Sequence, residues 1–121
     1  MDTSIFLPYI DVEDGLNRLM KNKKLYARLV KTFLSTASGL MDEIDAAVAS
    51  SDTSVALDRV HTLKGAAANL SYKRIQEDCI ELELDLKGNG ANAVSLHAAL
   101  KADYEFSMDM SEMLVPQLEA E

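Results

Sequence analysis

The chain has 121 residues, 48% of them hydrophobic, with only five glycines and two prolines, so it can bury one compact core without an obvious internal linker. Twenty acidic side chains against twelve basic ones give a formal net charge of −8, which disfavours binding to nucleic acid. No apolar run approaches the roughly 20 residues that span a bilayer, and the N-terminus lacks a basic region followed by an apolar stretch. We therefore expect a cytoplasmic protein with no membrane association.

The expected secondary structure is helical throughout, because apolar residues recur at intervals of three and four and strand-like alternation is absent. In chain order we expect a lead segment at 1–10, a short helix at 11–20, four longer helices at 23–49, 53–70, 72–87 and 91–115, and a frayed tail at 116–121. Pro116 sets the last boundary, since proline disfavours helical geometry in the residue before it. Together these segments predict one domain over residues 1–121.

Helix ends and apolar stripes indicate how the helices pack. Asp11, and Asp52 or Thr53, are suited to cap helix starts, and the Lys-Gly-Asn-Gly sequence at 87–90 marks a helix end followed by a tight turn. Apolar stripes with bundle spacing run through two helices: Tyr26, Leu29, Phe33, Ala37, Leu40, Ile44 and Ala47 in one, and Ala56, Val60, Leu63, Ala67 and Leu70 in the next. Short connections favour antiparallel neighbours. The predicted fold is all-α, an antiparallel up-down four-helix bundle over 23–115 with a short extra N-terminal helix.

Several residues that could suggest chemistry are interpreted as structural. The lone Cys79 excludes an internal disulfide, and it shares an apolar stripe with other residues of its helix, so a buried thiol is expected. Three methionines near the C-terminal end have helical spacing and are expected to fill the core: Met108, Met110 and Met113. His97 has no companion at ligand spacing and is expected at the surface or rim.

The segment His61-Thr62-Leu63-Lys64-Gly65-Ala66-Ala67-Ala68 carries the strongest functional signal. Each helical residue advances by roughly 100°, so Lys64 lies one turn from His61 while Gly65 and Ala68 lie almost in line with it. Glycine costs about 1 kcal/mol in a helix interior, which indicates that Gly65 admits a bulky partner. Lys64 offers an ammonium group suited to a phosphate oxygen. With glycine at i+4 and a cation at i+3, no metal site is predicted at His61.

The pattern His-x-x-Lys-Gly, followed by small residues and a helix break, resembles the active helix of the histidine-containing phosphotransfer (HPt) domains of bacterial multistep phosphorelays. The resemblance covers about residues 10–115 and includes further matching positions: Ile10-Asp11-Val12-Glu13-Asp14-Gly15-Leu16, Leu25-Tyr26, Phe33-Leu34 and Leu82-Glu83. The family often has glycine at the places of Ala68 and Ser71. We expect Ala68 to preserve access, Ser71 to cap the following helix, and Asn69 to take any left-handed turn conformation.

The resemblance implies a phosphorelay intermediate in which His61 accepts a phosphoryl group from a receiver-domain aspartate and passes it to another receiver domain. Lys64 would offset charge on the phosphoryl oxygens, and Gly65 and Ala68 would admit the partner. The implied partners are receiver domains and a hybrid sensor kinase, with Mg²⁺ held by the receiver and no cofactor bound by this chain. The chain is expected to be a monomer without autonomous kinase activity.

Partner docking is expected on the exposed face of the third and fourth helices. Basic side chains near His61 in sequence predict a region that would orient an acidic partner, although they could simply be solvated: Arg59, Lys73 and Arg74. Ile80, Glu83 and Leu84 lie off the main core stripe and are candidate docking residues, although Ile80 could equally belong to the core. Six of the twelve basic residues fall between Arg18 and Lys31.

Two alternatives remain open at this point. The chain could be a helical adaptor that binds receiver domains without accepting phosphate, although the pairing of His61 with Lys64 favours phosphotransfer. It could also be an excised module of a larger hybrid or chemotaxis-type kinase, whereas Met1 and the polar C-terminal residues favour a free-standing protein. The sequence leaves open the cognate kinase, the receivers and the direction of transfer; an exposed Nε2 is the expected phosphorylated atom.

Overall fold

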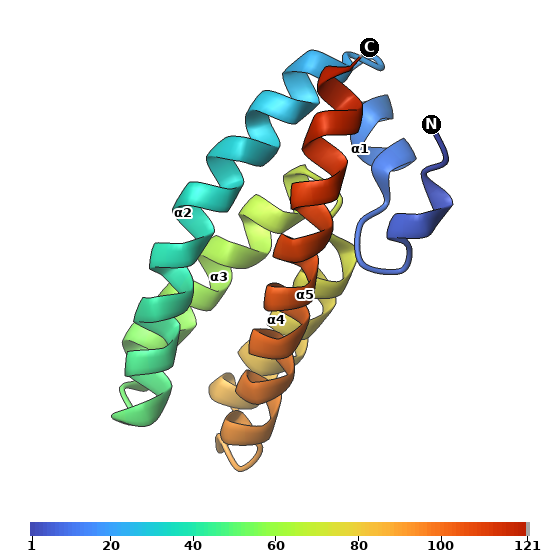
Figure 1. The fold of residues 1–121 in the computed structure, drawn as a ribbon. Coiled ribbons are helices and arrows are strands. Elements are labelled where there is room, and N and C mark those ends of the chain that lie inside the picture. Colours follow the sequence, from blue (N-terminus) through green and yellow to red (C-terminus); the bar gives the residue numbers. More distant parts are fainter. Residues whose placement is uncertain (121) are drawn as a thin grey trace.

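The computed structural model describes residues 1–120, which form five α-helices and one turn of 3-10 helix. Their bounds are η1 (Ser4–Phe6), α1 (Val12–Arg18), α2 (Lys23–Ala49), α3 (Thr53–Asn69), α4 (Lys73–Lys87) and α5 (Ala93–Glu119). Figure 1 shows α2 and α5 as two long neighbouring helices, with α3 and α4 packed behind them. The described residues contain no strand, so the predicted all-α bundle with an extra N-terminal helix is confirmed.

The core lies between α2, α3, α4 and α5, each of which packs against two others. The apolar stripe of α3 is buried along its whole length, and that of α2 is buried except for Leu29 and Leu40, which are partly buried. The lead segment also contributes, since Phe6 and Ile10 are fully buried. Tyr9 packs on Phe106 of α5 with ring centroids 4.5 Å apart. This segment therefore packs on the bundle.

Three helices start with a side-chain cap that satisfies one of the free N–H groups of the first turn. Asp11 accepts a hydrogen bond from the backbone N–H of Asp14, Asn22 from Leu25, and Asp52 from Val55. The caps predicted at Asp11 and Asp52 are confirmed. No helix within residues 1–120 has the length and apolar character needed to cross a membrane.

Three helices are followed, two residues after their last residue, by a residue with left-handed backbone that is not glycine. Met20, Ser51 and Ser71 have φ values of 55°, 58° and 61°. In each case the next residue donates its N–H to a carbonyl five positions earlier, as in the bond from Tyr72 to Ala67 (2.9 Å), and this closes the helix end.

The predicted roles of Ser71 and Asn69 are wrong. Asn69 is the last residue of α3, and Ser71 itself adopts the left-handed conformation. The side chain of Ser71 is buried and donates a hydrogen bond to Asp14 of α1, so it does not cap α4. The family's glycine at this place is explained by the same backbone conformation.

The predicted end of the last helix at Val115 is also wrong, because α5 continues through Pro116 to Glu119. A proline inside a helix costs about 3 kcal/mol. Burial opposes this cost, since Leu114 and Leu118 are fully inaccessible to solvent and each buried leucine contributes roughly 1.5–3 kcal/mol. Residues 117–119 therefore belong to the bundle, and Glu121 of the predicted tail lies outside the described residues.

The side chains interpreted as structural have mixed outcomes. Cys79 is buried, as predicted, and burial raises the pKa of its thiol to about 12. Met108 and Met110 pack against the core, but Met113 is exposed on the outer side of α5, so that prediction is wrong. His97 lies at the rim but is mostly buried, because its Nε2 contacts Asp45 of α2.

Candidate functional site

His61 lies in the middle of α3 on the side that faces away from the core. Its neighbours Val60 and Leu63 are fully buried and hold the helix against the bundle. The His61 side chain is 71% exposed. The sequence placed the imidazole at the edge of the apolar stripe, and the structure leaves it open to solvent.

A carboxylate lies directly beneath the imidazole. Nδ1 of His61 is 3.4 Å from Oε2 of Glu83, a residue of α4 whose side chain is only 8% exposed. The expectation that Glu83 lies on an exposed docking face is therefore wrong. Helix α4 packs against both α3 and α5, so its buried face is wider than one stripe and includes the position four residues after Cys79.

Two lysines hold the other oxygen of this carboxylate. Nζ of Lys64 and Nζ of Lys87 each lie 3.1 Å from Oε1 of Glu83. Lys64 is thus on the same side of α3 as His61. Lys87 was not singled out from the sequence, although its spacing of four residues from Glu83 is the usual signal for an ion pair on a helix. We call His61, Lys64, Glu83 and Lys87 the histidine cluster.

The charges of the cluster favour an ionised carboxylate. Burial acts to raise the pKa of Glu83, but the hydrogen bonds from Lys64 and Lys87 and their positive charges lower it further than burial raises it, so the pKa lies below its usual value. Two ammonium groups against one carboxylate leave an excess of one positive charge beside the imidazole.

Oε2 of Glu83 also constrains the imidazole. Among the described residues this buried atom has no hydrogen-bond partner by strict geometry, and Nδ1 of His61 is the basic nitrogen that faces it. A buried carboxylate oxygen is costly to leave unpaired. The arrangement favours the tautomer with the proton on Nδ1, which leaves the lone pair on Nε2.

Space around the imidazole is kept by small residues. Gly65 is exposed, and a Cβ added there would meet nothing within 4 Å. Packing inside the chain therefore gives no reason for glycine at this position. Ala68, one turn further along α3, is half-buried. No bulky side chain at these two positions therefore blocks another molecule from approaching His61.

The family model described as Hpt domain matches residues 28–115, nearly three quarters of the chain. The chain belongs to the Hpt domain family. The match spans the whole histidine cluster and the greater part of the bundle. Hpt domains take part in phosphotransfer within phosphorelays and interact there with receiver domains. Comparison with curated proteins and with solved structures returned no match.

The structure of this Hpt domain does not gather the basic residues Arg59, Lys73 and Arg74 around His61. Each is engaged by acidic side chains of the same chain: Arg59 by Glu43 and Asp58, Lys73 by Asp14, and Arg74 by Glu77 and Asp103. Lys73 precedes Glu83 by ten residues, about 15 Å along α4. Positive charge beside His61 therefore comes from Lys64 and Lys87.

Exposed apolar side chains flank the cluster on α4. Ile80 and Leu84 lie one turn apart, on either side of Glu83 in sequence, and both are exposed. Ile80 is thus not a core residue. On the other side of α3, a hollow of about 510 Å³ between α2 and α3 is lined by Ala66 and Asn69 and by apolar residues of α2. Among residues 1–120, no group of three or more His, Cys, Asp or Glu side chains is arranged to hold a metal ion.

Proposed function

We propose that this Hpt domain is a phosphorelay intermediate in which His61 accepts a phosphoryl group from the aspartate of one receiver domain and passes it to another. The observation that carries the proposal is the exposed imidazole whose Nδ1 faces a buried, ionised carboxylate while its Nε2 points away from that partner. Family membership supports the same class of reaction.

The transfer balances without a further reactant. The lone pair of Nε2 attacks the phosphorus of the aspartyl phosphate, the bond from phosphorus to the aspartate oxygen breaks, and the carboxylate leaves with the electron pair. Nδ1 keeps its proton, so the phosphorylated ring gains a positive charge that faces Glu83 at 3.4 Å. Transfer to a second receiver reverses these steps, and the imidazole returns to its neutral form.

The lysines of the cluster supply electrostatic stabilisation. Phosphoryl transfer depends mainly on positioning and on neutralising charge on the phosphoryl oxygens. Lys64 lies one turn from His61, and its ammonium group sits on the same carboxylate that His61 faces. The receiver would contribute Mg²⁺, which is expected on the partner and not on this chain.

Docking on the α3–α4 face is consistent with this reaction. Gly65 and Ala68 place no bulky side chain on α3 beside the imidazole, so a partner can approach it closely. Ile80 and Leu84 are exposed on α4 and offer apolar contact. We infer that a receiver covers this face during transfer, and that a hybrid sensor kinase supplies the phosphoryl group upstream.

The proposal is tested by incubating the protein with a phosphorylated receiver domain and following the label. We expect acid-labile, alkali-stable phosphate on the wild-type protein and none on His61→Gln. The matched control is His97→Gln, because His97 is the second histidine of the chain and contacts Asp45 on the other side of the bundle. That variant should be labelled as the wild type is.

A folded His61→Gln variant that still takes up label would overturn the site assignment. If no variant and no wild-type protein is labelled by any receiver that binds it, the protein is an adaptor and not a carrier. Circular dichroism on each variant separates these outcomes from loss of the fold.

A further inference from the structure

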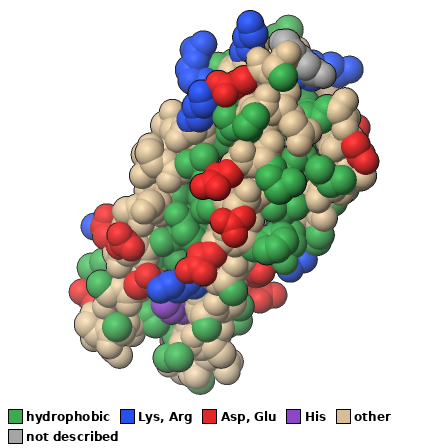
Figure 2. All heavy atoms as spheres, viewed as in Figure 1, with side chains coloured by type: hydrophobic (Ala, Val, Ile, Leu, Met, Phe, Trp, Pro, Cys, Tyr) green, Lys and Arg blue, Asp and Glu red, His purple; other side chains and the backbone are tan. Residues whose placement is uncertain are grey.

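The positive charge of the molecule is concentrated at one end of the bundle. Residues 18–31 contain six basic side chains and no acidic one, whereas the rest of the chain holds twenty acidic and six basic side chains. We call the surface formed by these six the basic end: Arg18, Lys21, Lys23, Lys24, Arg28 and Lys31. Figure 2 shows lysine and arginine side chains gathered at the end where α2 begins and α5 finishes.

Internal ion pairs neutralise only part of this charge. Arg18 pairs with Asp14 and Lys31 pairs with Glu119, and Lys23 also has an interaction partner. Within residues 1–120, no acidic side chain pairs with Lys21, Lys24 or Arg28. The basic end therefore exposes three positively charged side chains that form no ion pair within the described residues.

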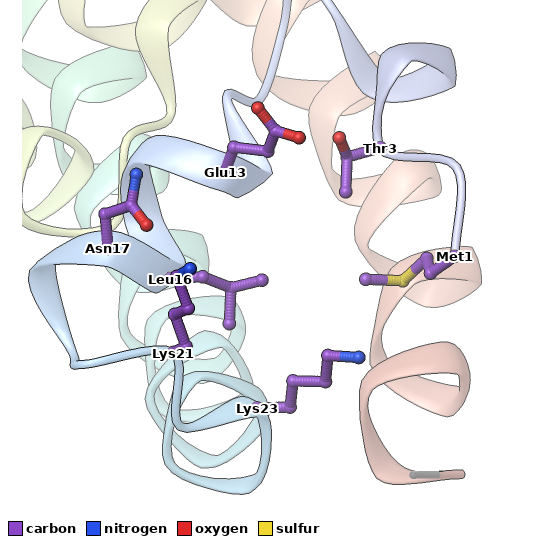
Figure 3. Close-up of a pocket in the computed structure, with 7 residues that line it drawn as sticks. All are labelled: Met1, Thr3, Glu13, Leu16, Asn17, Lys21 and Lys23. Carbon is purple, nitrogen blue, oxygen red and sulfur yellow. The ribbon is translucent and has the colours of Figure 1, made fainter.

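Two hollows open at the basic end, and each is lined by basic side chains together with one glutamate. One, of about 300 Å³, is lined by Lys24, Arg28, Lys31 and Glu119. The other, of about 360 Å³, lies between the lead segment, α1 and the start of α2. Figure 3 shows Lys23 extending into this second hollow from the start of α2, with Met1 opposite it and Glu13 at its far edge.

An exposed methionine stands among these cations. Met20, in the connection from α1 to α2, is 92% exposed. Met20 and Lys21 both have left-handed backbone, and the N–H of Lys21 donates to the carbonyl of Leu16 (2.7 Å). This turn ends α1, and glycine or asparagine would suit it better. Nothing inside the fold explains a large apolar side chain at its tip.

We propose that the basic end docks end-on against an anionic lipid surface, with Met20 entering the interface. Lysine and arginine side chains at such a surface contribute through the negative potential of the headgroups, and a protruding apolar side chain adds contact with the acyl boundary. A tip that projects beyond its surroundings suits a flat surface better than it suits a pocket in a protein partner. The proposal departs from the expectation of no membrane association, which rested on the lack of a spanning segment and of an N-terminal signal. It is independent of phosphotransfer.

End-on docking is compatible with the acidic body of the molecule. Helix α2 has 27 residues and is about 40 Å long, whereas electrostatic interactions in physiological salt decay over about 8 Å. Most acidic side chains would therefore lie beyond the range of the lipid charge. His61 is eight residues before the end of α3, about 12 Å along the helix, and would stay in water.

The experiment measures co-sedimentation of the full chain with vesicles of phosphatidylglycerol and phosphatidylcholine in equal amounts, and with vesicles of phosphatidylcholine alone. We expect binding to the anionic vesicles only. The double variant Lys24→Gln/Arg28→Gln should lower the affinity by about tenfold, and Met20→Ser by about threefold. The double variant Lys101→Gln/Arg59→Gln removes the same charge far from the basic end and should bind as the wild type does. His61→Gln should also bind normally.

Three outcomes would overturn the proposal. The first is equal loss of binding in the two double variants, which would mean that only net charge matters. The second is a Met20→Ser variant that binds as tightly as the wild type. The third is displacement from vesicles by inorganic phosphate or by polyglutamate at matched charge, which would assign the basic end to a soluble anion or to an acidic protein.

Discussion

His61 and Glu83 form a pair in which a buried carboxylate acts on an exposed imidazole. The carboxylate is kept ionised by Lys64 and Lys87, and its second oxygen is left to the imidazole at 3.4 Å. In the proposed transfer, Glu83 would not touch the incoming phosphoryl group. We therefore propose that it is a positioning residue, which would act by fixing which nitrogen of His61 carries the proton.

Replacing Glu83 tests this role directly. Glu83→Gln keeps an oxygen that can accept from Nδ1 but removes the charge, whereas Glu83→Ala removes both. We expect phosphotransfer to fall less for Glu83→Gln than for Glu83→Ala. The loss for alanine should be about tenfold or more, because no charge remains to offset the positive phosphorylated ring and no acceptor remains to face Nδ1. Nitrogen-15 NMR of the imidazole should show the Nδ1-protonated tautomer in the wild type and its loss in Glu83→Ala.

The control for Glu83 is Glu81→Gln, an exposed glutamate of the same helix. It should change neither the tautomer nor the rate. If Glu83→Ala is folded and keeps both the wild-type tautomer and the wild-type rate, the carboxylate serves only to pair the lysines.

Helix α5 illustrates how packing extends an element beyond its local signals. Pro116 removes a backbone donor, yet the helix continues because Leu114 and Leu118 are buried on the bundle and Lys31 of α2 pairs with Glu119. The same principle widens the buried face of α4, where contact with two neighbouring helices encloses Glu83. Periodicity within one helix predicts a stripe, and neighbours on both sides turn it into a broad face.

The contribution of the last turn of α5 can be measured by Leu118→Ala. A fully buried leucine replaced by alanine leaves a cavity, and we expect the free energy of unfolding to fall by about 2–4 kcal/mol in urea titrations. Met113→Ala is the matched control, because Met113 lies on the same helix but is exposed, and it should change stability by less than about 1 kcal/mol. Equal stability of the two variants would mean that the turn after Pro116 does not support the bundle.

The molecule as a whole is acidic along its body and basic at one end. Two aspartates of the body lie close enough to make its stability depend on pH. Asp78 of α4 faces Asp103 of α5, with Arg74 and Glu81 nearby on α4. Burial, followed by the hydrogen bond and charge of Asp103, raises the pKa of Asp78 to about 7. Arg74 opposes this shift but does not cancel it.

A raised pKa for Asp78 predicts that the protein loses stability as pH rises. The native state holds this proton up to about pH 7, whereas the unfolded chain releases it near its ordinary pKa of 3.8. The native state therefore binds more protons between these values, and the free energy of unfolding should fall between about pH 4 and pH 7. Asp78→Asn keeps a donor for Asp103 and cannot ionise, so this part of the decrease should be absent.

Urea titrations at about pH 5 and about pH 8 test the prediction. The wild type should lose more stability between the two conditions than Asp78→Asn does. Asp109→Asn, an exposed aspartate of α5, should behave as the wild type. Identical pH profiles for the wild type and Asp78→Asn would show that Asp78 is ionised throughout this range.

Much of this protein followed from local chemistry. Helical periodicity predicted all five α-helix starts to within two residues, and the caps at Asp11 and Asp52 were correct. The pattern His-x-x-Lys-Gly placed His61, Lys64 and Gly65 on one side of α3. These features depend on residues three or four positions apart, and such spacing is visible in a sequence.

Tertiary structure decided what lies opposite each residue. It placed Glu83 under His61 and brought Lys64 and Lys87 to that same carboxylate. It paired Arg59, Lys73 and Arg74 with acidic side chains away from His61. It also extended α5 beyond Pro116. The left-handed backbone at Ser51 and Ser71 was also not predictable from the sequence. Glycine is the usual residue in this conformation, and a serine gives no signal for it. Each depends on contacts between distant helices, and the depth of burial on both sides of a helix is set only when its neighbours are in place.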